Sequence, residues 1–225
     1  MIGRCKIGTC VATETHAREA DSRTSPFPEE TDMKTETSKI KATDLLKRQH
    51  TEVDKLFKRI ETAKDDSARS AAFVELARNL VAHDAIEREI FYPACEAAMG
   101  LTDLLGEALV EHGVVEFSLY QADCAQSGDG FEFKVTVLKE IVQHHVEEEE
   151  KEFFPKVEKK LGKEALEELG ARMEARFEAV KGKDFRPPLH KNLREVLAGA
   201  IHTGQNGDGA KKAPAKKTTS RARAS

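Results

Sequence analysis

The chain has 225 residues, enough for one domain with tails, and its 39% hydrophobic and 34% charged residues are typical of a helical soluble domain. No run of 18 or more apolar residues occurs, so we expect no membrane-spanning helix. The N-terminus lacks the continuous apolar segment of a secretory signal, and the expected location is therefore cytoplasmic.

Both ends of the chain differ in composition from its middle. Residues 1–37 are polar and rich in Ser, Thr and Pro, which predicts a disordered extension, and one hypothesis is that translation begins at Met33. Residues 202–225 form a predicted disordered tail rich in Lys, Ala and Pro. This tail carries six Lys or Arg within residues 210–225, and taking them from the net charge of −4 leaves −10 on the remainder.

The four cysteines show no metal-binding spacing. Cys5 and Cys10 lie in the polar N-terminal segment, while Cys95 and Cys124 fall in helical patterns. No Cys-x-x-Cys pair occurs, so we interpret all four as free thiols of a reducing compartment.

Apolar residues recur at helical spacing in four long segments, and no alternating strand pattern appears. The predicted fold is therefore all-α, an up-down-up-down four-helix bundle over residues 38–162. Loop signals, including Asp65-Asp66-Ser67, Gly100 and the Ser-Gly-Asp-Gly run at 127–130, separate the four segments. The predicted helices cover residues 39–64, 67–98, 102–125 and 131–160.

Two accessory C-terminal helices are predicted within residues 163–201. The first covers 163–181, with Leu166, Leu169, Met173 and Phe177 on one face. The Arg-Pro-Pro run at 186–188 ends it, and a short helix is expected at 189–201.

A spacing of possible metal ligands repeats at an offset of 62 residues. His50 and Asp54 recur as His112 and Glu116, and His83 and Glu87 recur as His145 and Glu149. Both members of each pair lie on one helix face, since four residues make about one turn. Successive pairs are 33, 29 and 33 residues apart, so antiparallel helices bring all four to a similar depth.

A shared cation explains why these side chains would converge. Burying several carboxylates and imidazoles without one costs several kcal/mol each, on the order of the penalties known for buried charges. A mixed imidazole and carboxylate set suits iron or manganese better than thiol-preferring metals. Zinc is the alternative that ligand type alone allows, although its usual four ligands would leave part of the cluster unused.

Pro93 and Pro155 recur at the same offset, inside two of the predicted helices. A proline in a helix interior costs about 3 kcal/mol and bends the helix. We therefore predict a purposeful bend at equivalent points of the second and fourth helices, just beyond the candidate metal ligands.

Four segments of the chain resemble the hemerythrin-like family, in particular its His-His-Glu cation-binding domains: KRQHTEVDKLF, AHDAIEREIFYP, EHGVVEFSLY and HHVEEEEKEFFP. The resemblance covers about residues 40–160. It implies a left-handed four-helix bundle around a non-heme centre of two iron ions. By motif position the implied ligands are His50, His83, Glu87, His112, Glu116, His145 and Glu149.

The chain departs from the oxygen-carrying members of that family in two places. Their third helix carries His-x-x-x-His, whereas this chain has Glu116 at the second position. In the fourth helix they use a His-x4-Asp spacing, which leaves two readings here, His145 with Glu149 or His144 with Glu149. The 62-residue register favours His145. Asp54 is an extra carboxylate that either bridges or accepts a hydrogen bond from a ligand.

Other polar and aromatic residues near the motifs have simpler interpretations. The remaining members of the run Glu147–Glu150 are expected to form a solvated helix face. Tyr92 and Tyr120 are expected to pack between helices rather than to act at the site. His16, His190 and His202 receive no role.

The expected function is that of a di-iron protein that binds, senses or detoxifies O2, H2O2 or NO. Whether it is an enzyme is left open, with catalase-like, peroxidase-like or NO-reducing activity as the candidates and Glu116 and Asp54 as candidate movable carboxylates. Iron storage of the ferritin-like kind is one alternative, although those bundles use Glu-x-x-His pairs. Weak nucleic-acid binding by the basic tail is another.

Overall fold

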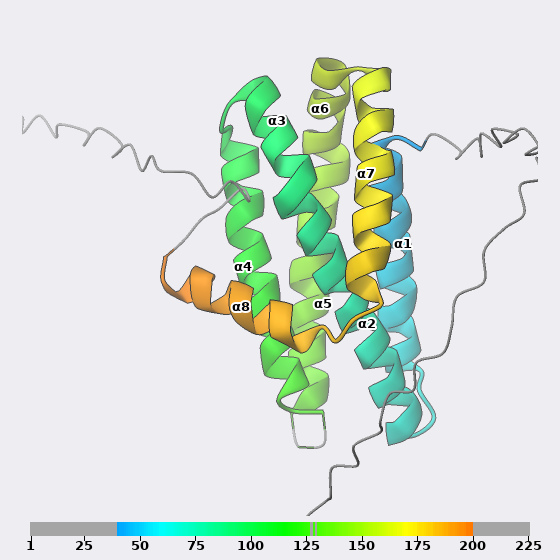
Figure 1. The fold of residues 1–225 in the computed structure, drawn as a ribbon. Helices are drawn as coiled ribbons and strands as arrows, with labels where there is room; N and C mark the ends of the chain where they lie inside the picture. Colours follow the sequence, from blue (N-terminus) through cyan, green and yellow to red (C-terminus); the bar gives the residue numbers. More distant parts are fainter. Residues whose placement is uncertain (1–39, 127, 129, 200–225) are drawn as a thin grey trace, which may run out of the picture. The chain divides into compact units, whose positions relative to one another are not determined.

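The computed structural model describes residues 40–126, 128 and 130–199, and this part of the chain is helical without strands. Four antiparallel rods form the bundle (Figure 1), which confirms the predicted all-α fold. The expectations for residues 1–37, including Met33, and for 202–225 lie outside the described residues. None of the described helices is both long and apolar enough to cross a membrane.

Each rod lies within a few residues of its predicted range. The first is α1 (Ala42–Glu61) and the third is α4 (Asp103–Asp123). The second and fourth each consist of three segments in direct succession. These are α2 (Asp66–Ile86), η1 (Glu87–Phe91) and α3 (Tyr92–Met99), and then α5 (Phe131–Glu148), η2 (Glu149–Phe153) and α6 (Phe154–Leu161).

Local sequence explains where these rods begin and end. The Asp65 carboxylate accepts a hydrogen bond from the Ala68 backbone N–H at 2.8 Å, and Thr102 caps α4 in the same way through Leu105. Gly100 and Gly162 follow the last turns of α3 and α6 with a φ of 77°, a conformation that side chains disfavour. Large apolar side chains fill the space between the rods, including Phe57, Phe73, Leu76, Leu105 and Leu119.

The distortion predicted near the two prolines is present as a π-helical turn. In η1 the Tyr92 N–H bonds to the carbonyl of Glu87, five residues back, and in η2 the Phe154 N–H bonds to Glu149. The α-helix resumes after each π turn with the proline in its first turn, where a missing N–H costs nothing. Where the sequence predicted a bend, the structure thus has a one-residue π-helical insertion, which begins at each candidate ligand glutamate.

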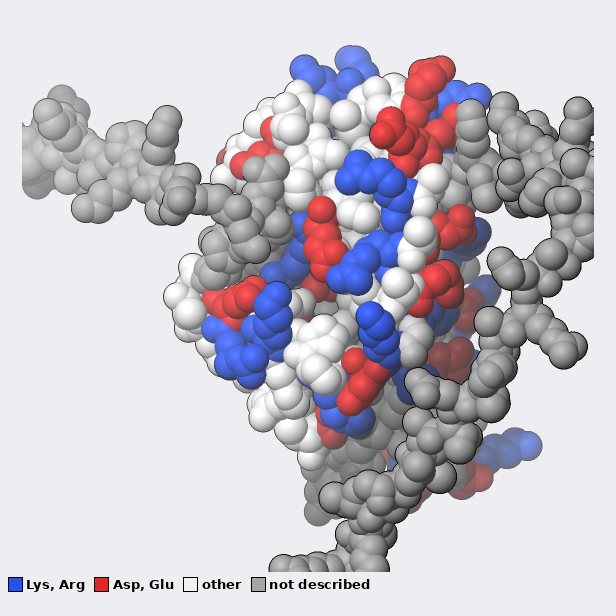
Figure 2. Space-filling view, in the orientation of Figure 1, with Lys and Arg blue, Asp and Glu red and all other residues white. Residues whose placement is uncertain are grey.

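The two C-terminal helices pack on different rods of the bundle. Helix α7 (Lys163–Lys181) matches its predicted range and packs on α1 and α2, while α8 (Arg186–Leu197) packs on α4. The prediction that α8 starts at residue 189 was wrong, because Pro187 and Pro188 fit the first turn of a helix and so start α8 rather than only ending α7. Figure 2 shows interspersed acidic and basic side chains on the outward face of these helices.

Gly170 sets how closely α7 approaches the start of α1. A Cβ atom at this position would lie 2.1 Å from the carbonyl oxygen of Ile40, and backbone cannot move aside cheaply. We expect Gly170→Ala to lower the free energy of unfolding by roughly 1–3 kcal/mol. Chemical denaturation of the purified chain measures this.

Gly106, inside α4, provides the matched control. A Cβ there meets nothing within 4 Å, so Gly106→Ala should raise the free energy of unfolding by about 0.5–1 kcal/mol through helix propensity alone. Equal effects of the two substitutions would contradict the close contact between α7 and α1.

Candidate metal centre

The bundle gathers four imidazoles and two carboxylates at one level of its interior. His50, His83, His112 and His145 come from α1, α2, α4 and α5, one from each rod. Glu87 and Glu149 are the first residues of the two π turns. All six side chains are buried, with at most 7% of any residue exposed.

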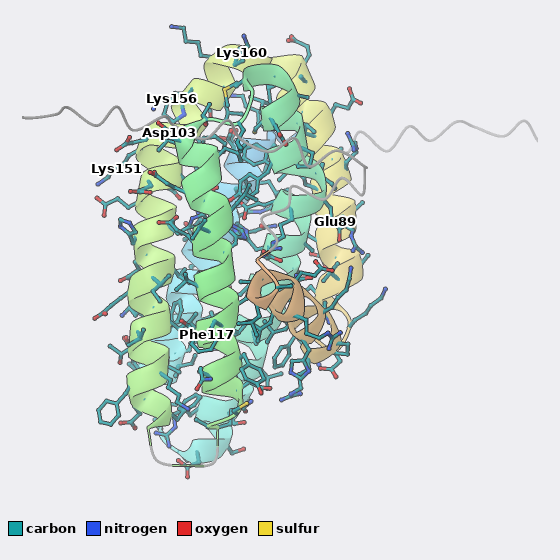
Figure 3. All side chains as sticks on the ribbon, turned by 90° about the vertical axis from the view of Figure 1, so that its left-hand side faces the viewer. Glu89, Asp103, Phe117, Lys151, Lys156 and Lys160 are labelled. Atoms are coloured by element: carbon teal, nitrogen blue, oxygen red, sulfur yellow. The ribbon has the colours of Figure 1, made fainter. Side chains whose placement is uncertain are left out.

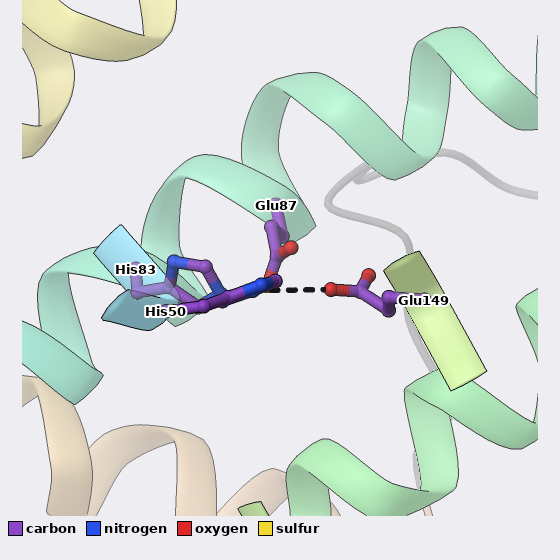
Figure 4. A group of neighbouring side chains, drawn as sticks. All are labelled: His50, His83, Glu87 and Glu149. Atoms are coloured by element: carbon purple, nitrogen blue, oxygen red, sulfur yellow. Dashed lines mark ion pairs between the residues drawn. The ribbon is translucent and has the colours of Figure 1, made fainter. Parts of the chain in front are cut away.

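These residues form two groups that share Glu87. One group contains His50, His83, Glu87 and Glu149, and the other contains Glu87, His112 and His145, with the ligand atoms of each group within 4.8 Å of one another. Figure 4 shows the first group, in which His50, His83 and Glu87 face Glu149. Six of the seven predicted ligands are thus brought together.

The distances between the inward atoms are those expected around a metal ion. Glu87 Oε2 lies 3.1 Å from His83 Nε2 and 3.2 Å from His112 Nε2. Glu149 Oε2 lies 3.4 Å from His50 Nε2 and 3.7 Å from His145 Nε2. Two ligands that each lie about 2.1 Å from one ion, at the tetrahedral angle, are about 3.4 Å apart.

A second set of side chains fixes the orientation of every imidazole. Each Nδ1 lies within hydrogen-bond distance of a side-chain oxygen, which accepts its proton and turns Nε2 toward the centre. The four pairs are His50 with Glu150 at 2.8 Å, His83 with Gln49 at 2.8 Å, His112 with Asp84 at 2.7 Å and His145 with Glu111 at 2.8 Å. The expectation that Glu150 only faces solvent was wrong, because α1 brings His50 against it.

Electrostatics show that the protein atoms alone do not satisfy this cluster. Both oxygens of Glu87, Oε2 of Glu149 and Nε2 of His50 are buried without a hydrogen-bond partner. Orphaned buried carboxylate oxygens are rare and costly. The residues therefore fit a cation, which would satisfy them.

The pKa values of the imidazoles report the same excess of negative charge. Burial opposes protonation of His50, but the adjacent carboxylates of Glu149 and Glu150 outweigh it and raise the pKa to about 9. Burial likewise opposes protonation of His112, while Asp84 and Glu87 raise its pKa to about 10. Protons on these imidazoles compensate the carboxylates, and a metal ion would replace them.

Tyr92 also belongs to this centre, although the sequence predicted only a packing role. Its hydroxyl lies 2.8 Å from His112 Nε2 and donates to Glu149 Oε1 at 3.0 Å. Burial is the main reason why the pKa of this phenol is well above its usual value. The equivalent position in the repeat is Phe154, so the loss of symmetry at this one position was the available signal.

The structure keeps Glu116 out of both groups. Its Oε2 accepts a hydrogen bond from the Arg88 guanidinium at 3.1 Å, and Arg88 also bonds to Asp84 at 2.8 Å. Burial, together with the nearby Asp84 carboxylate, raises the pKa of Glu116 to about 8. Glu116 therefore bonds within the layer that holds His112. It also lines the cavity beside the four imidazoles, and its Oε1 is buried without a hydrogen-bond partner.

Asp54 and His144 also lie outside the buried cluster. Asp54 is half-buried and forms an ion pair of 2.6 Å with Lys58, one turn further along α1, so it neither bridges nor holds an imidazole here. His144 has 64% of its side chain exposed, whereas His145 is buried in the second group. The 62-residue register thus selected the histidine that the structure turns inward.

Helix α8 supports the centre from outside the four rods. Asn192 donates a hydrogen bond to Asp84 Oδ2 at 3.0 Å, and Asp84 holds His112. The close approach is possible because residue 113 is glycine, since a Cβ there would lie 2.9 Å from Val196 Cγ1. No local pattern connects residue 192 with residue 112, so only the folded chain reveals this contact.

A cavity of about 40 Å³ adjoins the two groups. That volume holds one water or a diatomic molecule, since a single water needs roughly 10–15 Å³ by this measure. The four imidazoles and the carboxylates Asp84 and Glu116 line part of it, and the rest of its wall is aliphatic: Val53, Leu80, Val81, Val115, Leu119, Val142 and Val146. The space beside the inward nitrogens therefore favours a small, uncharged molecule.

The chain belongs to the family described as Hemerythrin HHE cation binding domain, which it matches over residues 41–157. Members of this family bind metal cations, typically iron. The matched range contains all six clustered ligands and Tyr92, and the resemblance inferred from the four motifs is thereby confirmed.

Similar proteins extend this match. A crystal structure of a hemerythrin HHE cation-binding domain-containing protein from Mycobacterium kansasii is 32% identical, with a TM-score of 0.59, and the alignment covers 68% of this chain and 99% of that one. An uncharacterized protein of Mycobacterium tuberculosis is 29% identical over 160 residues, 70% of this chain and 98% of its own length. A DNA nickase of Nostoc is 27% identical over 62% of this chain and 39% of its own length.

Substitution of the two adjacent histidines of α5 tests which one binds metal. We expect His145→Ala to remove iron from the purified chain, because it deletes one of the inward nitrogens. His144→Ala should leave the tightly bound iron unchanged, since its ring lies on the surface. Metal analysis after passage over a chelating resin measures both, and equal iron contents in the two variants would contradict the assignment.

Two buried glutamates offer a second comparison. Glu149→Gln removes a charge that faces two imidazoles. We expect it to weaken iron binding by more than about tenfold, which is more than the loss of a residue that only orients a ligand would cause. Glu116→Gln keeps the shape of a side chain that bonds to Arg88 and should retain the iron. Competition with a chelator of known affinity gives both values, and iron loss in Glu116→Gln would restore Glu116 as a ligand.

Proposed function

We propose that this chain holds two iron ions and uses them to bind and reduce a small uncharged oxidant, namely O2, H2O2 or NO. The observation that carries the proposal is that two ligand groups share Glu87 and adjoin an aliphatic cavity of about 40 Å³. A carboxylate between two groups is the arrangement of a dinuclear centre, and the cavity has room for a two-atom molecule next to it.

The donor set supports iron rather than zinc. Four imidazoles and two carboxylates, with the Tyr92 phenol beside them, exceed the four ligands that one zinc ion takes. Imidazole and carboxylate together suit iron, and Cys95 is the one buried cysteine among the described residues. Burial raises the pKa of the Cys95 thiol well above its usual value, so it is protonated and a poor ligand.

The residues have separable roles in this proposal. His50, His83, His112, His145, Glu87 and Glu149 would hold the iron, which supplies the electrons for reduction when bound. Gln49, Asp84, Glu111 and Glu150 keep the imidazoles oriented. The Tyr92 hydroxyl lies between His112 and Glu149 and holds a proton beside both side chains. The valine and leucine side chains that make up most of the cavity wall favour a small, uncharged molecule.

The alternatives are less well supported by this site. Storage bundles of the ferritin-like kind use Glu-x-x-His pairs and a carboxylate-rich set, whereas imidazoles predominate here. The nucleic-acid contact expected for the basic tail stays a prediction, because residues 200–225 lie outside the described part of the chain.

The cavity provides the experiment. With iron-loaded protein we expect H2O2 to be consumed with release of O2, two H2O2 giving two H2O and one O2. Val142→Ile and Val142→Phe should lower this rate in order of size while the iron content stays constant, because the side chain faces the cavity. An oxygen electrode and iron analysis measure the two quantities.

Val137→Phe is the control for the cavity substitutions, since Val137 lies on the same helix with 49% of the residue exposed. It should leave the rate unchanged. The proposal is overturned if iron-loaded protein contains two irons per chain, yet neither consumes H2O2 nor changes its absorption spectrum with O2 or NO.

A further inference from the structure

A second group of possible metal ligands lies on the surface, one layer outside the buried centre. It consists of Glu111 from α4 with His144 and Glu148 from α5. Each member directly precedes a buried site residue in the sequence, as Glu111 precedes His112, His144 precedes His145 and Glu148 precedes Glu149. One residue rotates a helix position by about 100°, so the same two helices present an outer group beside the inner one.

The side chains of the outer triad lie close enough to share one ion, with their ligand atoms within 4.8 Å of one another. His144 Nε2 lies 3.4 Å from Glu111 Oε1 and 3.6 Å from Glu148 Oε1. Both distances exceed the usual N–H···O limit of about 3.2 Å. They match the separation of about 3.4 Å between two atoms that each bind one ion at about 2.1 Å.

The outer triad is not a by-product of the internal repeat. At the offset of 62 residues its positions correspond to Gln49, Ala82 and Ile86, which cannot form such a group. Ala82 and Ile86 are fully buried, and α7 packs over that half of the bundle. The two halves thus keep the buried ligands in common and differ at the outer positions.

The seam between α4 and α5 is open where the equivalent seam is covered. Figure 3 looks onto these two helices, which run side by side with no described helix in front of them. The side chains of His144, Glu148 and Glu111 are 64%, 34% and 20% exposed. A hydrated cation can therefore reach all three from solvent.

We propose that Glu111, His144 and Glu148 form a second site for a divalent first-row transition-metal ion, with water completing its coordination. One imidazole and two carboxylates suit Fe²⁺, Mn²⁺ or Zn²⁺. The outer site shares Glu111 with the buried centre, because Oε1 of Glu111 faces His144 while Oε2 lies 2.8 Å from His145 Nδ1. An ion at the outer site would therefore bind the same carboxylate that orients the buried His145 imidazole. The effect of this sharing on the iron rests on the proposed function, whereas the outer site itself does not.

Zinc added to the iron-loaded full chain tests the site, because the two elements are counted separately. After equilibrium dialysis against Zn²⁺, we expect the wild-type chain to hold one more zinc than His144→Ala, with the same iron in both. Glu148→Gln should likewise lose this zinc. Equal zinc contents of the wild-type chain and His144→Ala would overturn the proposal.

Glu147→Gln is the charge-matched control for Glu148→Gln. Glu147 is the neighbouring residue, pairs with Lys151 and is not part of the triad, so this variant should keep the zinc. Zinc loss from both glutamine variants would overturn the proposal, since it would show a general effect of surface charge. A metal-free preparation gives the same difference between wild type and His144→Ala even if the buried iron is absent, so failure of the proposed function is recognised separately.

The sharing of Glu111 has its own readout. Zinc should change the absorption spectrum of the iron-loaded wild-type chain and of Glu147→Gln, and should leave that of His144→Ala unchanged. Zinc bound without any spectral change would overturn the sharing.

Discussion

Glu87 and Glu149 lie in an apolar interior with oxygens that no hydrogen bond satisfies. An ionised carboxylate in such a place is stable only beside positive charge, which protonated imidazoles or a cation can supply. Four histidines surround these two glutamates, one from each rod, and each is held from behind by a further side chain. The buried carboxylates at the centre of the bundle thus need a compensating positive charge, which a metal ion can supply.

The same constraint accounts for the irregular helices. A π turn begins at each of the two glutamates and ends two residues before a proline. Such insertions are uncommon in helices and are often found at functional sites. Here they occur twice, at equivalent points of the repeat, and the aromatic residues that follow, including Tyr92, are buried against the centre. The cost of the distortion is offset by a ligand position that regular helix geometry would not give.

The two halves of the bundle share their ligands but differ in their surroundings. Helix α7 covers α1 and α2, and α8 reaches His112 through Asn192 and Asp84. The α4–α5 seam remains accessible in the described part of the chain and carries the outer triad. Access to the buried residues is therefore asymmetric, although the sequence repeat that builds them is nearly symmetric.

The sequence by itself determined the helices, their order and the six clustered candidate ligands. Helical periodicity is a property of residues close along the chain, and the 62-residue repeat can be read directly from the sequence. It also located the helix distortion at Pro93 and Pro155. The ligand role expected for Glu116 stays a prediction, because in this structure its carboxylate bonds to Arg88. Sequence reasoning missed the contacts of Tyr92, Glu150 and Asn192, which depend on another helix. Only tertiary structure decided these, since the partner of a side chain is set by how the rods pack and not by spacing along any one of them.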